Sequence, residues 1–163
     1  MRFDEQSRGA LVSKYAEGPA RLRAAWASVP EEARQWRPAP GQWSAHEIVV
    51  HCSDSETNAA QRIRYVLAEK DTTIIGYDQE VWARDFDYHA HPAEVALQAV
   101  DAVRANTTAL LRRLPTEAWS KAGRHSEHGR YSAEDWLALY AEHVHNHANQ
   151  IERNLAAWHK ARA

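Results

Sequence analysis

Residues 132–159 carry large side chains at steps of three and four residues, and this pattern restricts the fold more than any other feature. An α-helix has 3.6 residues per turn, so such steps place the side chains on one face of a long amphipathic helix. Ser132 and Asp135 form a capping pair that predicts the start of this helix, which is expected to end at about His159. The face consists of Trp136, Tyr140, His143, His147, Ile151, Leu155 and Trp158.

Two further amphipathic stretches lie in the first half of the chain. The first covers about residues 7–27, where the Gly18-Pro19 dipeptide is expected to kink or break the helix. The second begins at Ser44 and is expected to reach about residue 69. Ser44 and Glu47 match the capping box, in which each side chain accepts a hydrogen bond from the other residue's backbone N–H.

A third long helix is expected over residues 92–114, because proline is favoured in a first turn and Pro115 ends the stretch. Residues 70–90 appear as an irregular connection with one short helix around residues 80–84. A later connection, residues 116–131, has room for two short extended pieces, and no strong strand pattern occurs anywhere. These elements predict an all-α fold, a four-helix bundle with long connections.

Composition limits the class of protein. A chain of 163 residues suits a single domain spanning residues 1–163. The net charge is −2 and no run of Lys or Arg forms a basic stripe, so nucleic-acid binding is not expected. No apolar run is long enough for a membrane span, and the start MRFDEQSRGA lacks a signal-peptide core, which favours a cytoplasmic protein. Cys52 is the only cysteine, which excludes an intrachain disulfide and a cysteine-based zinc site.

The last helix presents two histidines, His143 and His147, in the middle of its apolar face. A spacing of four residues offsets the two rings by only about 40° around the helix, so they can share one metal ion. Burying two unpaired imidazoles would cost about 1–3 kcal/mol each. The pattern therefore leaves two explanations, a metal site or a pair of hydrogen-bonded core histidines.

His51 is the best third ligand, because it lies on the inward side of the second helix. His46 competes for this role, but five residues correspond to about 140° around a helix, so His46 and His51 cannot bind one metal from a single face. Val144 stands where the H-E-x-x-H motif of zinc peptidases has its catalytic glutamate, which excludes that class. His145 points away from His143 and is expected at the surface.

Several other residues could support such a site. His125 and His128 precede Gly129 in a predicted loop, where we expect them to be exposed to solvent, with the mouth of a pocket as the alternative. Gln150 follows His147 by three residues and could orient its ring. Cys52 adjoins His51 but points about 100° away from it, so it is expected to be a buried thiol and not a ligand.

Two segments together resemble the DinB/YfiT-like superfamily. GQWSAHEIVVHCSDSE resembles the second-helix signature of this family, W-S-x-x-E-x-x-x-H, and HVHNHANQI resembles its last-helix signature, H-x-x-x-H-x-x-Q-I. GYDQEVW and HSEHGRYS also resemble its connecting segments. The similarity extends from about residue 7 to about residue 158.

The resemblance implies a four-helix bundle, often a homodimer, that binds a divalent metal through His51, His143 and His147. Members of the family include transferases and isomerases that use the thiols mycothiol or bacillithiol, and others described as metal-dependent hydrolases. The resemblance thus defines the expected site more closely than the reaction.

Three neutral imidazoles leave coordination positions open for water or a small-molecule substrate, which is typical of catalytic metal sites. Two reactions are consistent with such a site: thiol S-transfer from a low-molecular-weight thiol, and hydrolysis with Asp54, Glu56 or Glu142 as a candidate base. A non-catalytic metal-binding or sensor module is the alternative. Zinc and nickel are the metals we expect first, because imidazole suits both.

Overall fold

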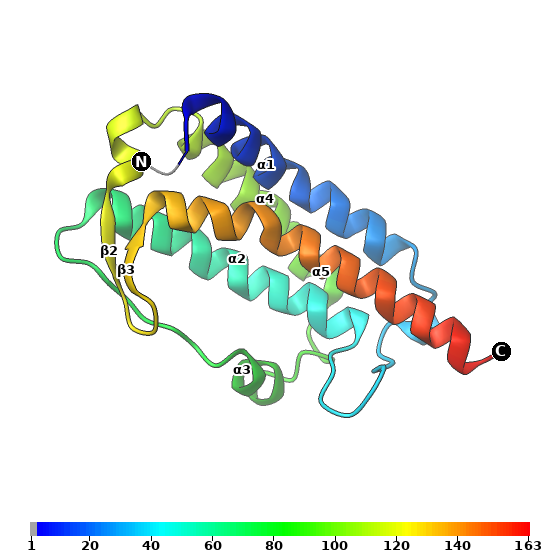
Figure 1. The fold of residues 1–163 in the computed structure, drawn as a ribbon. Helices are drawn as coiled ribbons and strands as arrows, with labels where there is room; N and C mark the ends of the chain where they lie inside the picture. The colour runs from blue at the N-terminus through cyan, green and yellow to red at the C-terminus, as the bar shows by residue number, and fades with distance from the viewer. Residues whose placement is uncertain (1–2) are drawn as a thin grey trace.

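Four long helices form the body of the protein in a computed structural model that describes residues 3–163 (Figure 1). α1 packs against α5 and α4, and α2 packs against the same two helices, so α1 and α2 lie diagonally opposite each other. The all-α four-helix bundle expected from the sequence is therefore confirmed. The four helices are α1 (Glu5–Ala27), α2 (Ala45–Ala68), α4 (Ala93–Leu111) and α5 (Ala133–Ala161).

The two predicted capping pairs are present. The Ser44 hydroxyl accepts from the backbone N–H of Glu47, and the Glu47 carboxylate accepts from the backbone N–H of Ser44. Ser132 and Asp135 make the same reciprocal pair at the start of α5. Each pair satisfies backbone N–H groups that the first helical turn leaves without a partner. These caps fix where the two helices that carry the histidines begin.

The connections contain short elements of their own. The 3-10 turn η1 (Glu31–Ala33) lies between α1 and α2, and η2 (Thr116–Ser120) follows α4. The short helix expected around residues 80–84 is α3 (Gln79–Asp85), whose first turn is capped by the side chain of Asp78.

A small three-stranded sheet lies at one end of the bundle, where α2 ends and α5 begins (Figure 1). β2 (Ala122–His125) pairs antiparallel with β3 (Gly129–Ser132), so the two extended pieces expected in this connection are confirmed. β1 (Thr73–Ile74) pairs parallel with β2, although its segment was expected to be irregular. A two-residue strand has no periodicity to recognise, and its pairing partner lies about 50 residues away in the sequence.

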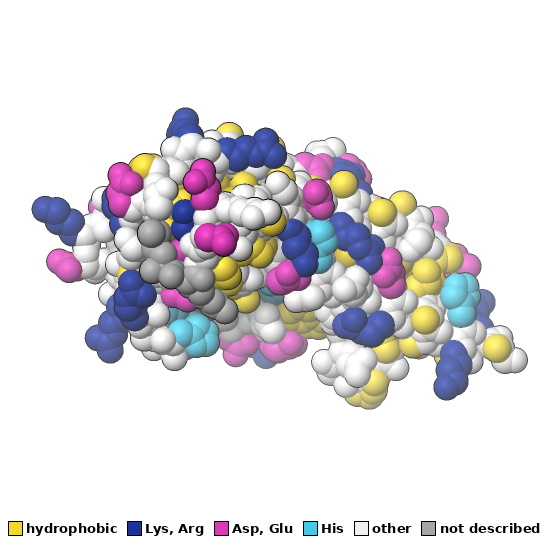
Figure 2. Space-filling view, turned by 45° about the horizontal axis from the view of Figure 1, so that its top comes forward, with side chains coloured by type: hydrophobic (Ala, Val, Ile, Leu, Met, Phe, Trp, Pro, Cys, Tyr) yellow, Lys and Arg dark blue, Asp and Glu magenta, His cyan; other side chains and the backbone are white. Residues whose placement is uncertain are grey.

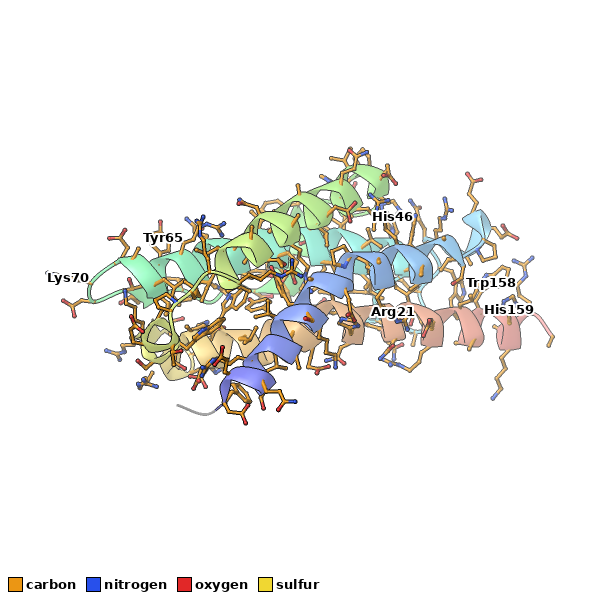
Figure 3. The ribbon with its side chains drawn as sticks, turned by 90° about the horizontal axis from the view of Figure 1, so that it is seen from above. Arg21, His46, Tyr65, Lys70, Trp158 and His159 are labelled. Atoms are coloured by element: carbon orange, nitrogen blue, oxygen red, sulfur yellow. The ribbon has the colours of Figure 1, made fainter. Side chains whose placement is uncertain are left out.

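The Gly18-Pro19 dipeptide does not break α1, which runs through both residues and changes direction near its middle (Figure 3). Proline has no backbone N–H, so the Tyr15 carbonyl four residues earlier lacks its helical partner. Arg104 of α4 replaces that partner: its Nη1 donates to the Tyr15 carbonyl at 2.6 Å. A Cβ on Gly18 would lie only 2.3 Å from the same Nη1. The side chain of Arg104 thus packs on the dipeptide. Of the kink or break expected there, the break is absent and α1 instead changes direction.

The buried core has two apolar clusters separated by a polar layer. One cluster includes Leu22 and Ile48, and the other includes Ile63 and Trp136. Between them lie the charged side chains of Glu56 and Arg104, both fully buried, together with His143 at the edge of the layer. The candidate site therefore lies at the middle of the bundle and not at its end.

The surface mixes acidic and basic side chains over the face shown in Figure 2, without a large patch of one sign. Among the described residues, no helix is long and apolar enough to cross a membrane.

Candidate metal centre

The structure brings His51, His143 and His147 together. One potential ligand atom from each side chain lies within 4.8 Å of the other two. The ring of His51, from α2, lies 5.5 Å from the ring of His143 and 4.7 Å from that of His147, while the two α5 rings are 4.6 Å apart, measured between centroids. Two helices that are remote in sequence thus supply three imidazoles to one small volume.

Two of the rings are held by a hydrogen bond at Nδ1. Nδ1 of His143 lies 3.2 Å from Oε1 of Glu56, and Nδ1 of His147 lies 3.0 Å from Oε1 of Gln150. In metalloproteins, such a bond fixes the tautomer and the direction of the ring, and it leaves Nε2 as the donor. The Ser55 hydroxyl is 3.3 Å from Nε2 of His143. The contact between Gln150 and His147 was expected from their spacing of three residues.

His51 is the most enclosed of the three, with only 2% of its surface exposed and the Trp43 ring 4.7 Å away between centroids. Its Nδ1 is buried and has no hydrogen-bond partner among residues 3–163. Burial, followed by the nearby imidazoles of His147 and His143, lowers the pKa of His51 well below its ordinary value. The ring is therefore neutral at pH 7, the form that donates to a metal.

His147 is likewise held in its neutral form. Burial, followed by the neighbouring His143, lowers the pKa of its imidazole to about 4. The three imidazoles cannot all be protonated next to one another, and the buried Nδ1 of His51 has no partner among the described residues. In donor type and spacing, the three rings fit a divalent cation.

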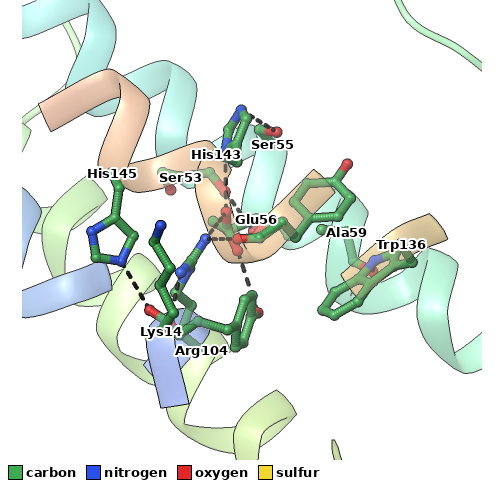
Figure 4. Close-up of polar contacts among 12 residues, drawn as sticks. Lys14, Ser53, Ser55, Glu56, Ala59, Arg104, Trp136, His143 and His145 are labelled. Atoms are coloured by element: carbon green, nitrogen blue, oxygen red, sulfur yellow. Dashed lines mark hydrogen bonds and ion pairs between the residues drawn. The ribbon is translucent and has the colours of Figure 1, made fainter. Parts of the chain in front are cut away.

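A buried ion pair between Glu56 and Arg104 contacts the ring of His143 (Figure 4). Oε1 of Glu56 accepts from Nη2 of Arg104 at 2.7 Å, and Arg104 also donates to the Tyr140 carbonyl at 2.8 Å. Burial alone would raise the pKa of Glu56, but the Arg104 charge and the hydrogen bond with His143 lower it. Glu56 is therefore an ionised acceptor that orients His143. Its partnership with Arg104 was not foreseen from the sequence.

The other two candidate bases are engaged elsewhere. Glu142 forms an ion pair with Lys14 of α1 at 2.5 Å, and both side chains are more than 40% exposed. Asp54 accepts from the hydroxyl of Tyr88 at 2.6 Å. Neither carboxylate belongs to the group of side chains that line the space beside the three histidines.

That space is a pocket of about 170 Å³, which His51, His143 and Ser55 line from the bundle side. His125 and His128 line it from the β2–β3 hairpin, which is the alternative and not the favoured expectation of exposed loop residues. Their rings stack with centroids 4.7 Å apart, and His125 is 5% exposed. The candidate centre is thus accessible to a small molecule from the side of the sheet.

The excluded histidines point elsewhere. Nε2 of His46 contacts the carbonyl of His91, remote from the centre. Nε2 of His145 contacts the Lys14 carbonyl at 2.9 Å, so this residue is partly buried against α1 and not fully at the surface as expected (Figure 4). Cys52 is completely buried, and burial raises the pKa of its thiol, so it supplies no thiolate at neutral pH.

A larger cavity, of about 380 Å³, lies on another side of Trp43. Arg37, Glu47 and His89 line it, but none of the three clustered histidines does. Two of its charged residues are engaged with each other, since Glu47 pairs with Arg37 and also caps α2. We therefore place the candidate chemistry in the smaller pocket.

Known proteins resemble this chain in sequence. The sequence model of the DinB superfamily matches residues 14–151. A protein of Oceanobacillus iheyensis is 30% identical over 111 residues, which cover 68% of this chain and 64% of the relative. A protein of Halalkalibacterium halodurans is 27% identical over 137 residues, which cover 84% and 80% of the two chains. Both carry the name "putative metal-dependent hydrolase".

Among solved structures, YfiT from Bacillus subtilis superposes with a TM-score of 0.87, covering 93% of this chain and 87% of that one at 24% identity. It is described as "a probable metal-dependent hydrolase with an unusual four-helix bundle topology". At this identity the likeness shows a shared fold. The family assignment comes from the sequence match, which covers most of the chain: this protein belongs to the DinB superfamily.

Proposed function

We propose that this protein is a metal-dependent enzyme in which His51, His143 and His147 hold one divalent cation beside a small substrate pocket. The observation that carries the proposal is the convergence of three imidazoles from two helices, two of which, His51 and His143, line an accessible pocket. Structural metal sites are usually closed by four protein ligands, whereas three ligands leave a position for a reactant.

A divalent cation bound by three neutral ligands keeps its full charge, so it would acidify a bound water or thiol and polarise a substrate carbonyl. Glu56 and Gln150 would hold His143 and His147 in their donor tautomers. The enclosing ring of Trp43 would keep water away from the far side of His51. We favour zinc or nickel for the cation, since both accept imidazole donors.

Hydrolysis of a small ester or amide is the first reaction class, and the names of the sequence relatives support it. Thiol S-transfer is the second, and a specific observation favours it. Glu56, Glu142 and Asp54 are all engaged, so none of the three candidate bases is free to activate water. The acidic residue among the described lining residues is Glu127, whose side chain is 60% exposed on the β2–β3 hairpin. A low-molecular-weight thiol, such as bacillithiol, mycothiol or glutathione, would release its proton to bulk water on binding the cation, so it would need no base in the pocket.

Metal content tests the site. Elemental analysis of freshly purified protein should find about one zinc or nickel per chain, and His51→Ala, His143→Ala and His147→Ala should each lose most of it. His145→Ala is the matched control, because it lies between two candidate ligands on the same helix but faces α1. Full metal content in His51→Ala and His147→Ala would refute the proposed centre.

Activity assays separate the reaction classes. The metal-loaded protein should turn over either small esters and amides in water alone or electrophilic acceptors in the presence of one of the three thiols. The dependence on added thiol distinguishes transfer from hydrolysis. A fully loaded protein that is inactive in both sets of assays would instead be a metal-binding or sensor module.

A further inference from the structure

We propose that the substrate of this pocket carries a carboxylate group, and that Arg62 is the residue that recognises it. The inference rests on the proposed function, because it takes the three histidines as the metal centre at one end of the pocket. It adds the substrate class and a specificity-determining residue.

Arg62 lies on the same side of α2 as His51. Eleven residues separate them, which on a regular helix corresponds to an angular offset of only about 20° and a rise of about 16 Å. Side chains on a helix lean toward its N-terminus, which for Arg62 is the direction of His51. Both residues line the pocket of about 170 Å³.

The guanidinium of Arg62 is held in place from two other parts of the chain. Its Nη2 donates to the carbonyl of Ile75 at 2.8 Å, and its Nη1 donates to the hydroxyl of Tyr140 at 3.3 Å. Its central carbon lies 5.6 Å from the centre of the Tyr77 ring. The Tyr140 ring is in turn 5.6 Å from the His143 ring. The ring of Tyr140 therefore lies between the guanidinium of Arg62 and His143, a candidate metal ligand.

These contacts leave Arg62 with capacity for an anion. A guanidinium has five N–H donors in a planar fork that matches a carboxylate, and the two hydrogen bonds engage one donor each on Nη1 and Nη2. Within residues 3–163, Arg62 makes no ion pair with an acidic side chain, whereas Arg104 and Arg37 do.

The rest of the pocket favours one anionic group. Arg62 is the only lysine or arginine among the described lining residues, and Glu127 is the only acidic one. The Glu127 carboxylate packs against Gly76. The other polar groups are mainly hydroxyls, such as those of Tyr77 and Tyr131, and imidazoles. After burial, the charge of Arg62 further lowers the pKa of His125, so this neighbour does not compete as a second cation at neutral pH.

The size of the pocket suits a small bifunctional molecule. Pockets for drug-sized ligands usually exceed about 300 Å³, so this one has room for a smaller compound or for part of a larger one. A molecule with a metal-binding group at one end and a carboxylate at the other would use both fixed groups of the pocket, the histidine cluster and Arg62.

A pair of probe thiols tests this inference without a known substrate. Cobalt-loaded protein is titrated with 3-mercaptopropionate and with its neutral amide, 3-mercaptopropanamide, and binding is followed by the thiolate-to-cobalt charge-transfer band. The wild-type protein should bind the acid roughly 10- to 100-fold more tightly than the amide, the range expected for a charge-assisted hydrogen-bonded pair. Arg62→Gln should abolish this preference while leaving the amide affinity and the cobalt content unchanged.

Two further variants complete the experiment. Arg62→Lys keeps the charge without the planar fork and should retain part of the preference. Arg124→Gln removes an equal charge from an exposed position next to His125, outside the pocket, and should behave as the wild type. Equal affinities of wild-type protein for acid and amide, or an equal loss of both in Arg62→Gln, would overturn the inference. Absence of the band with both probes in cobalt-loaded protein would also overturn it, whereas failure of the wild-type protein to bind cobalt would refute the metal centre itself.

Discussion

His143 depends on residues from two other helices for its orientation. Glu56 of α2 accepts its Nδ1–H, and Arg104 of α4 keeps that carboxylate ionised in a fully buried position. The sequence contains one sign of this arrangement. Arg104 occupies the buried face of its helix, between Val100 and Leu111, where a charge requires a partner. The identity of that partner could not be predicted, because the pairing spans 48 residues and follows from the packing of the helices.

Substitution of Glu56 tests this network. Glu56→Gln preserves the shape of the side chain but leaves the buried Arg104 charge uncompensated. We expect the free energy of unfolding to fall by about 3–5 kcal/mol, measured by urea denaturation of the metal-free protein. Glu142→Gln is the control, because its exposed ion pair with Lys14 should contribute no more than about 1 kcal/mol. Similar losses in the two variants would contradict the assigned role of the buried pair.

The arrangement of α1 shows where local sequence rules fail. Gly18 and Pro19 each weaken a helix in isolation, and together they predict a kink or a break. The helix continues because Arg104 supplies the missing donor to the Tyr15 carbonyl and fills the space above Gly18. The capping boxes at Ser44 and Ser132, by contrast, depend on residues only three positions apart. The sequence therefore predicted them correctly.

Two alanine substitutions in α1 test this reading. Gly9→Ala should stabilise the protein by about 0.5–1 kcal/mol, because nothing lies within 4 Å of the new Cβ and alanine favours a helix. Gly18→Ala should instead destabilise it by about 1–3 kcal/mol, since its Cβ would meet Arg104. Thermal or urea unfolding of both variants gives the comparison. A stabilising Gly18→Ala would mean that Arg104 does not depend on this position.

At the scale of the whole molecule, most of the fold follows from patterns in the sequence. Helical periodicity and two caps predicted the bundle, and a spacing of four residues predicted that His143 and His147 lie together. The position of His51 beside them required the helices to pack in a particular register, which periodicity alone does not determine. The small sheet was harder still to predict from the sequence, because β1 is defined only by its pairing with β2.

Metal binding should stabilise the whole bundle, because the proposed ligands join α2 to α5. With free zinc at about 100 times its dissociation constant, linkage predicts a gain of about 2.7 kcal/mol in the free energy of unfolding. Urea denaturation with and without zinc measures this gain, and a chelator should remove it. His51→Ala should show almost no response, while His159→Ala, which alters an exposed residue, should respond as the wild type. Equal responses in both variants would place the metal elsewhere.

The contacts of Arg104 have a consequence for how this sequence can change over evolutionary time. Gly18 gives the arginine space, Pro19 frees the carbonyl that it binds, and Glu56 balances its charge. Replacing any one of these residues leaves the others with a collision, a competing donor or an unmatched charge. Lineages should therefore exchange these positions as a set, and related proteins without the arginine should also lack the proline. Such covariation would link an α1 dipeptide to the orientation of a histidine more than 120 residues later in the chain.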